Sequence, residues 1–326
     1  MHQENAWTFF LCHGILSMYI GISSLIWSEN RKERILNMGY VIVTDSGIDL
    51  TQKMIAELEL VVGALKFTIE GKTYEDRSDK SELSTPTFYN MLREGKTSVT
   101  TQINTEEFKD LFEPILKKGE DVLYIGFSGG LSGTYQSACI AADELREMYP
   151  ERKLYTVDSL CASMGQGLLV YHAAQLKKNG TDIDVLYAWL KENLMKLCHW
   201  FTVDDLNHLK RGGRVSAATA LVGTVLGIKP VLHVDDEGHL INVAKARGRK
   251  ASLDMLVQKM EESAIEPENQ TVFISHGDCY EDAKYVADKI RAKFGTKKFE
   301  INFVGPVIGG HAGPGVVALF FFGKQR

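Results

Sequence analysis

From Gly39 onward, short apolar runs of the sequence alternate with segments that have the periodicity of helices. Such alternation is typical of parallel strands that are joined by crossover helices. In the first half of the chain it predicts strands at 40–44, 61–69, 122–127 and 154–157. It predicts a helix at 49–60, a second that Asn104 or Thr105 caps, a third that ends at 147, and one or two more over 163–197 with a break at 179–180. The sequence therefore predicts an α/β fold with a doubly wound, mostly parallel sheet.

The pattern changes near residue 198, where we place a domain boundary. Residues 230–246 alternate around Asp236-Glu237-Gly238, as the two strands of a β-hairpin would. Further elements are expected as helices at 250–263 and 280–293 and strands at 271–275, 298–304 and 316–322, the last of which could belong to either sheet. We therefore expect one α/β domain over 38–197 and a second, mixed α/β domain over 198–326.

The first 37 residues differ in character from the rest and form a non-domain extension. Residues 7–27 carry no charged side chain, and a run of this length can span a bilayer. Met38 offers a second interpretation, because MGYVIVTDSGIDL has the pattern of a domain start, so that the preceding residues would not be made in the cell. A mobile arm is the third interpretation. Membrane contact is expected only if residues 7–27 belong to the native protein.

Composition and charge exclude several classes of protein. The chain has 326 residues, enough for two domains with a core each. Its formal charge of -5, without a long basic block, gives no electrostatic footprint for nucleic acid. The five cysteines include no CxxC pair, so the sequence indicates neither a zinc site nor a disulfide framework. We expect no metal, no cofactor, no nucleic acid partner and a cytoplasmic location.

The segment SGGLSGTYQSA at 128–138 directly follows the predicted strand at 122–127. Ligands of an open parallel sheet bind outside the carboxyl ends of its strands. Glycines there allow close approach to the backbone, and a helix start favours an anion, which could be a carboxylate or a phosphate. A tight turn with Ser132 as helix N-cap is the simpler interpretation. Neither a Walker loop nor a GxGxxG turn is present here, so a nucleotide is not indicated.

Polar residues also gather at other predicted strand ends and in two glycine-rich segments. Thr100 and Thr101 precede a predicted helix, whereas Arg214 and His311 lie in KRGGR and GGHAGPG. Each residue alone is more often a cap or a solvated surface group than a ligand contact. In a cleft, however, an arginine would form a fork for a carboxylate or a phosphate. His311, between glycines, has too little side-chain cover to be an obvious core histidine.

Several motifs together resemble the DegV family. They occur in that family's order and cover nearly everything from residue 38 onward: TDSGIDL at 44–50, TTQINTEEF at 100–108, FSGGLSGTYQSA at 127–138, VDS at 157–159, LKRGGRVS at 209–216, GIKPVL at 227–232, KARG at 245–248 and GGHAGPG at 309–315. The resemblance implies a two-domain bacterial fatty acid-binding protein. It also implies a carrier that does no chemistry itself and presents its fatty acid to the catalytic subunit of a fatty acid kinase.

The same resemblance implies where the ligand lies. The acyl chain would occupy an apolar tunnel of the first domain, where burial gains about 0.8 kcal/mol per CH2. The carboxylate would end at the cleft between the domains. Matching by motif, Thr100, Thr101 and Ser128 would hold the carboxylate, with Arg214 and His311 closing over it from the second domain.

Two positions depart from the family pattern. Gly129 stands where the family commonly has a second serine, and Ile103 stands where it has a proline. The carboxylate is then expected to contact Ser128, the N–H of Gly129 and the threonines, and the lost hydrogen bond weakens binding by about 0.5 to 1.5 kcal/mol.

The resemblance also implies a role for Arg247, which is expected to face the kinase or the new phosphate.

Two other function classes remain open. One is a lipid-sensing regulatory module whose partner is not a kinase. The other is an enzyme acting on a small carboxylate or phosphate compound, since the same loops would suit either anion. The sequence places no nucleophile beside a base and shows no metal-ligand spacing, which disfavours the enzyme.

Overall fold

The computed structural model describes residues 39–216 and 227–326. The expectations for residues 1–37, including the possible membrane span at 7–27, lie outside this part of the chain. Within the two described ranges, no helix is both long enough and apolar enough to cross a membrane.

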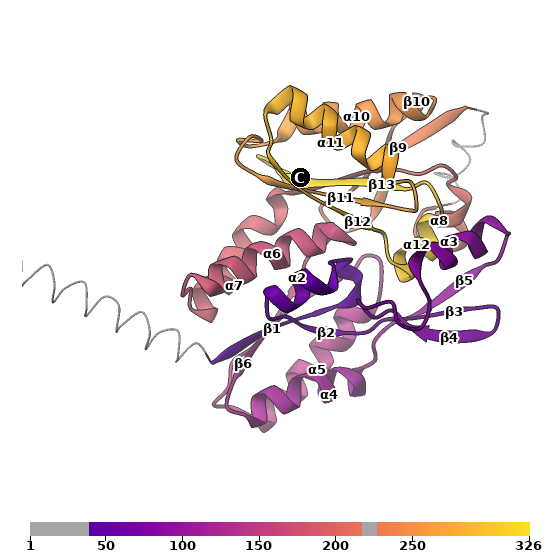
Figure 1. Cartoon of the computed structure of the whole chain (residues 1–326). Coiled ribbons are helices and arrows are strands. Elements are labelled where there is room, and N and C mark those ends of the chain that lie inside the picture. The colour runs from indigo at the N-terminus through magenta and orange to yellow at the C-terminus, as the bar shows by residue number, and fades with distance from the viewer. Residues whose placement is uncertain (1–38, 217–226) are drawn as a thin grey trace, which may run out of the picture.

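A parallel sheet of four strands forms one half of the molecule (Figure 1). Its order is β2 (Val61–Gly63), β1 (Tyr40–Asp45), β6 (Asp121–Gly126), β7 (Leu154–Asp158), and every neighbouring pair is parallel. One face is covered by α4 (Thr105–Lys117) and α5 (Thr134–Met148), the other by α6 (Met164–Lys178) and α7 (Ile183–Asn193). The predicted parallel sheet with helices on both faces is confirmed.

The first half also contains a small antiparallel sheet, which is distinct from the parallel sheet. It has the order β4 (Lys72–Glu75), β3 (Lys66–Ile69), β5 (Ser98–Thr101). The prediction of one strand over 61–69 was therefore wrong, because β2 and β3 belong to different sheets. The strands β3 and β4 form a hairpin around Glu70 and Gly71, both with positive φ, as a two-residue turn requires.

The second half of the chain builds a six-stranded mixed sheet. Its order is β10 (Leu240–Arg247), β9 (Ile228–Val234), β8 (Leu197–Thr202), β13 (Val317–Phe322), β11 (Thr271–His276), β12 (Lys298–Phe303). The β11–β12 pair is parallel and the others are antiparallel. Helices α10 (Arg249–Ser263) and α11 (Tyr280–Phe294) cover one face. The predicted hairpin and second mixed sheet are confirmed, and the last strand joins this sheet.

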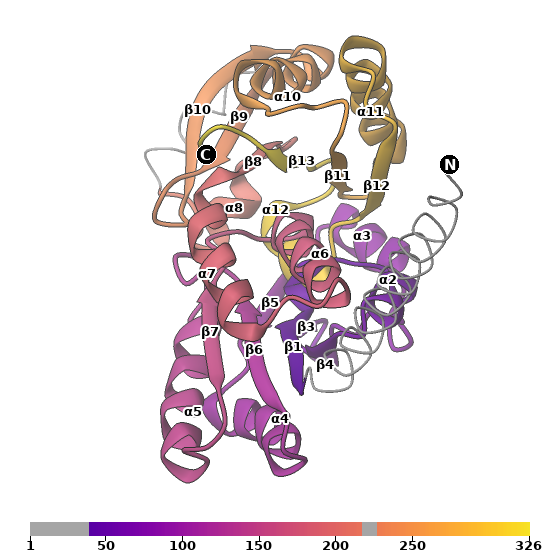
Figure 2. The same ribbon diagram turned by 90° about the vertical axis from the view of Figure 1, so that its left-hand side faces the viewer.

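Helix α6 lies between the parallel sheet and the six-stranded sheet (Figure 2). Its first seven residues are all buried, as expected for a helix that is packed on both sides. Two glycines permit the close approach. A Cβ atom at Gly165 would lie 2.7 Å from the ring of Phe320, and one at Gly167 would lie 2.6 Å from the carbonyl oxygen of Ile48. Because α6 contacts both sheets, one core runs through the middle of the molecule.

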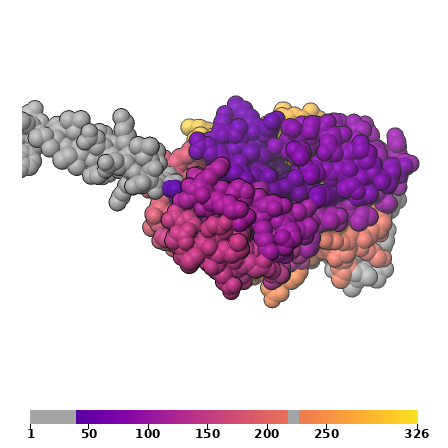
Figure 3. Space-filling model, turned by 90° about the horizontal axis from the view of Figure 1, so that it is seen from below, coloured from indigo at the N-terminus to yellow at the C-terminus, as the bar shows by residue number. Residues whose placement is uncertain are grey.

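Short helices complete the fold: η1 (Ser46–Ile48), α2 (Gln52–Glu57), α3 (Thr85–Arg93), η2 (Leu194–Lys196), α8 (Asn207–Arg211) and α12 (Pro306–Ala312). Helix α12 contacts α3, β3, β5 and α8, so this helix of the second half packs against the small antiparallel sheet of the first half. The glycines of GGHAGPG serve this packing, since a Cβ atom at Gly309 would lie 2.5 Å from the hydroxyl of Tyr89. Seen from below, indigo and magenta residues of the first half form most of the surface (Figure 3).

The predicted domain boundary near residue 198 stays a prediction. Strand β8 begins at Leu197, close to that position. The contacts of α6 and α12, however, connect the first and second halves of the chain extensively.

Candidate functional site

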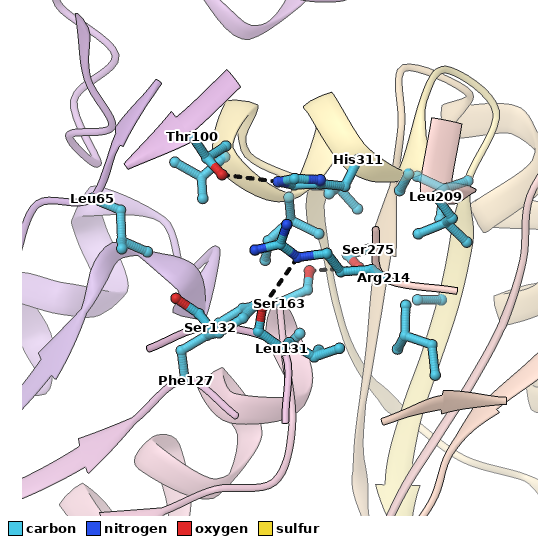
Figure 4. Close-up of a pocket in the computed structure, with 18 of the residues that line it drawn as sticks. Leu65, Thr100, Phe127, Leu131, Ser132, Ser163, Leu209, Arg214, Ser275 and His311 are labelled. Atoms are coloured by element: carbon cyan, nitrogen blue, oxygen red, sulfur yellow. Dashed lines mark hydrogen bonds between the residues drawn. The ribbon is translucent and has the colours of Figure 1, made fainter. Parts of the chain in front are cut away.

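A cavity lies where the two halves of the chain meet (Figure 4). It adjoins about 760 Å³ of space free of protein atoms, part of which is open solvent. From the first half it is lined by β5 and the loops that follow β6 and β7. From the second half it is lined by β8, β11, β13, α8 and α12. Both halves therefore supply the walls of this cavity, whereas the expected acyl-chain tunnel within the first domain stays a prediction.

Thr100 and His311 meet at one end of the cavity. Oγ1 of Thr100, on β5, lies 2.9 Å from Nε2 of His311, on α12. Burial, together with repulsion from Arg214, lowers the pKa of His311 to about 4. The imidazole is therefore neutral near pH 7, with one ring nitrogen as donor and the other as acceptor. Gly212 makes room for this ring, since a Cβ atom there would lie 2.0 Å from Nδ1.

Arg214 extends its guanidinium into the same end of the cavity (Figure 4). Its Nε donates to the carbonyl of Leu131 at 3.1 Å, and Nη1 donates to the carbonyl of Gly212 at 2.5 Å. The side chain is half-buried, and no carboxylate of the described residues forms an ion pair with it. Burial lowers the pKa of Arg214, but a guanidinium keeps its charge in a protein. A half-buried cation without an acidic partner is suited to a ligand anion.

Thr101 also lines this end and is exposed, as is the neighbouring Gln102. The structure thus brings together four of the residues that the sequence singled out, Thr100, Thr101, Arg214 and His311. Buried apolar side chains from both halves, among them Leu65, Phe127 and Phe201, line other parts of the wall. The cavity therefore combines a polar, partly exposed end with an apolar interior.

Ser128 and Gly129 are not part of the cavity lining. The hydroxyl of Ser128 is fully buried, donates to the carbonyl of Gly238 at 2.9 Å and accepts from the N–H of Gly130. The N–H of Gly129 donates to Oδ2 of Asp158 at 3.0 Å. The expectation that both groups hold the carboxylate stays a prediction; in this structure the tip of the β9–β10 hairpin and Asp158 are their hydrogen-bond partners.

The absence of a side chain at position 129 has a steric reason. A Cβ atom there would lie 2.7 Å from Oδ2 of Asp158, whose other oxygen accepts from the N–H of Leu160 at 2.9 Å. Gly130 is constrained in the same way, since its Cβ atom would lie 2.8 Å from the carbonyl of Glu237. The glycines of this turn therefore let the hairpin tip and Asp158 pack against it.

Helix α5 starts one residue later than predicted. Its N-cap is Gly133 rather than Ser132, and the helix runs from Thr134. The Ser132 hydroxyl still accepts from the N–H of Thr134 at 3.3 Å and lines the cavity. The predicted cap of α4 is confirmed, because Asn104 and Glu107 form a reciprocal capping box.

No prediction from the sequence identified the buried polar group that lies behind the cavity. The Asp49 carboxylate accepts from the Ser163 hydroxyl at 2.5 Å and from the N–H of Gly305 at 2.9 Å. Ser163 lies in turn 2.9 Å from the hydroxyl of Ser275, and both serines line the cavity (Figure 4). Burial, then repulsion from Asp76, raises the pKa of Asp49 to about 7. TDSGIDL carries a strand-end signal, but nothing local shows that Asp49 reaches α12.

Arg247 lies at the end of β10, is exposed and does not line the cavity. Within residues 39–216 and 227–326 no group of three or more His, Cys, Asp or Glu side chains is arranged to hold a metal ion. The four cysteines in the described part of the chain are free.

Comparison with known proteins gives one consistent result. The family model for DegV, described as an uncharacterised protein family, matches residues 40–324. A DegV domain-containing protein of Clostridium perfringens is 49% identical over 287 residues, covering 88% of this chain and 98% of that protein.

Two solved structures have similar folds. One, from Thermus thermophilus, is described as showing fatty acid binding of a DegV family protein. It has a TM-score of 0.77 and 29% identity, covering 87% of this chain and 99% of that one. The other is DegV of Bacillus subtilis, described as a fatty acid binding protein. It has a TM-score of 0.76 and 29% identity, covering 88% and 100% of the two chains.

Replacement of Asp49 by Asn tests the raised pKa of this carboxyl. The amide keeps an acceptor for Gly305 and gains a donor for Ser163, and asparagine tolerates the positive φ of 51° at this position. The folded-state pKa of about 7 exceeds the unfolded value of about 3.9, so stability from Asp49 is present at acid pH and lost as the pH rises between these values.

Urea unfolding at several pH values measures this loss. We expect D49N to gain roughly 2 to 4 kcal/mol relative to the wild type between about pH 4 and about pH 8, with the change centred below pH 7. D143N, on the exposed side of α5, serves as the control and should show no such gain. A constant difference between D49N and the wild type over this range would contradict the assignment.

Proposed function

This chain belongs to the DegV family, and from that premise we propose that it binds a long-chain fatty acid in the cavity, with the carboxylate at the Arg214–His311 end. The observation that carries the proposal is the guanidinium of Arg214, half-buried at the polar end of an apolar cavity and without an acidic partner among the described residues. The relatives from Thermus thermophilus and Bacillus subtilis, described as binding fatty acids, support it.

The polar end supplies the groups that a carboxylate needs. Arg214 offers charge and N–H donors, and charge-assisted hydrogen bonds are stronger than neutral ones. The Thr100 hydroxyl and Nε2 of His311, which are within hydrogen-bond distance of each other, add two polar groups without charge at the same end of the cavity. Because His311 is neutral near pH 7, it contributes a hydrogen bond rather than a charge. The exposed Thr101 hydroxyl completes the set.

The apolar interior supplies most of the affinity for the acyl chain. Each buried CH2 gains about 0.8 kcal/mol, so a long chain gains far more from burial than the carboxylate gains from its hydrogen bonds. In this proposal the polar end fixes the direction in which the chain enters. The carboxylate then stays at the partly exposed end, where a second protein can reach it.

We propose that the chain itself does no chemistry and presents the carboxylate to a separate ATP-using kinase. In that step a carboxylate oxygen attacks the γ-phosphorus, the bond to the β,γ-bridging oxygen breaks, and ADP leaves. The product is an acyl phosphate. Arg247, exposed beyond the cavity on β10, is the candidate contact for the kinase or the new phosphate.

Replacement of Arg214 by Gln tests the carboxylate site. The wild type should bind palmitate more tightly than hexadecanol, which has the same chain without the carboxylate. R214Q should lose about tenfold to a hundredfold in palmitate affinity and little in hexadecanol affinity, because a hydrogen bond to a charged group contributes about 1.5 to 3 kcal/mol. Isothermal titration or displacement of a fluorescent fatty acid measures both ligands.

R211Q is the matched control for this experiment. Arg211 is exposed, contacts His208 and does not line the cavity, so its loss should leave both affinities unchanged. Equal losses of palmitate and hexadecanol affinity in R214Q would contradict a carboxylate contact at this residue.

Replacement of Arg247 by Ala tests the proposed contact with a fatty acid kinase. With a fatty acid kinase and ATP, acyl phosphate can be trapped by hydroxylamine and measured. R247A should lower its formation several-fold without changing fatty acid affinity. R291A, on α11 across the sheet from the cavity, should match the wild type. Fatty acid binding without acyl phosphate formation in the wild type would favour the lipid-sensing module instead.

A further inference from the structure

His199 places a polar ring in the apolar part of the cavity. It lies on β8, is 4% exposed and lines the cavity together with Phe201, two residues further along the same strand. Its ring packs 5.4 Å from that of Phe201 and 4.6 Å from that of Phe320, between centroids. A buried nitrogen in such surroundings is costly unless it has a hydrogen-bond partner.

One ring nitrogen of His199 is occupied by protein. Nδ1 lies 3.8 Å from Sγ of Cys161, and the same sulfur lies 4.0 Å from Nη2 of Arg326. A guanidinium can only donate, so the sulfur accepts from Arg326, and Nδ1 is the available acceptor for the thiol proton of Cys161. In that arrangement the neutral ring carries its own proton on Nε2. Burial, followed by repulsion from His233 and Arg326, lowers the pKa of His199 well below its usual value, which keeps the ring neutral.

The other nitrogen, Nε2, has no hydrogen-bond partner among the residues that the structure describes. It is also not one of the fully enclosed unpartnered atoms, which include Asp76 Oδ2 and Trp200 Nε1. His199 lines the cavity, and Nε2 is the ring nitrogen that no group of the described residues occupies, so it is the one available to a ligand there. By contrast, Ser163 and Ser275, also in the lining, have each other and Asp49 as partners.

We propose that Nε2–H of His199 is a donor to an oxygen on the acyl chain, so that this cavity selects a fatty acid with a hydroxyl group along its chain. The proposal rests on the proposed function and specifies its ligand. An unsubstituted chain covers the donor and leaves it unpaired. A hydroxyl at the matching carbon accepts the hydrogen bond and removes that penalty.

The test compares octadecanoic acid with hydroxyoctadecanoic acids that carry the hydroxyl at different carbons. The wild type should bind at least one hydroxy acid about threefold to tenfold more tightly than octadecanoic acid, the factor expected of one hydrogen bond. In H199F, which keeps a flat ring without the donor, this preference should disappear and octadecanoic acid should bind as tightly as before or more tightly.

Three further variants control the result. H172F makes the same replacement on α6, outside the cavity lining, and should keep the wild-type preference. H199Q retains a donor and should keep part of the preference. H199L takes the place of H199F if the phenylalanine variant does not fold.

Two outcomes would overturn the proposal in distinguishable ways. If octadecanoic acid binds but every hydroxy acid binds equally or more weakly, or if H199F keeps the preference, the role of His199 fails while fatty acid binding stands. If the wild type binds none of these acids, the proposed function fails together with it.

Discussion

The buried carboxylate of Asp49 is the constraint on which the rest of the structure depends. It follows the first strand of the parallel sheet, yet it accepts from Ser163 at the start of α6 and from Gly305 at the start of α12. Its own carbonyl accepts from Asn302 on β12 at 2.8 Å. One residue thereby connects the parallel sheet, the central helix and the six-stranded sheet. Ser163 and its partner Ser275 also line the cavity, so this connection lies directly behind the cavity wall.

The two halves contribute different parts of the site. The first half brings the Thr100 hydroxyl on β5, and the second half brings the charge of Arg214 and the ring of His311. The charge of Arg214 and burial together keep His311 neutral, so the site has one cation and one neutral pair at its polar end. Gly129 and Gly130 of SGGLSGTYQSA lie outside the cavity lining, where they make room for Asp158 and for the tip of the β9–β10 hairpin.

Local patterns predicted the elements better than their contacts. The parallel strands, the 230–246 hairpin and the cap at Asn104 follow from neighbouring residues, and the structure confirms them. The family resemblance gathered Thr100, Thr101, Arg214 and His311, which do meet. The pairing of β3 with β5 and the contact of Ser128 with Gly238 join residues far apart in sequence, and no local pattern indicates either. The same is true of Asp49 with Gly305 and of His199 in the cavity wall.

The proposed function requires an acyl chain in the cavity between the two halves. Native mass spectrometry of the protein purified from a bacterial host, followed by lipid extraction, tests it most directly. The account predicts one fatty acid bound to each protein molecule, and rebinding of added fatty acid to the delipidated protein. A protein that is isolated empty and does not take up added fatty acid would contradict it.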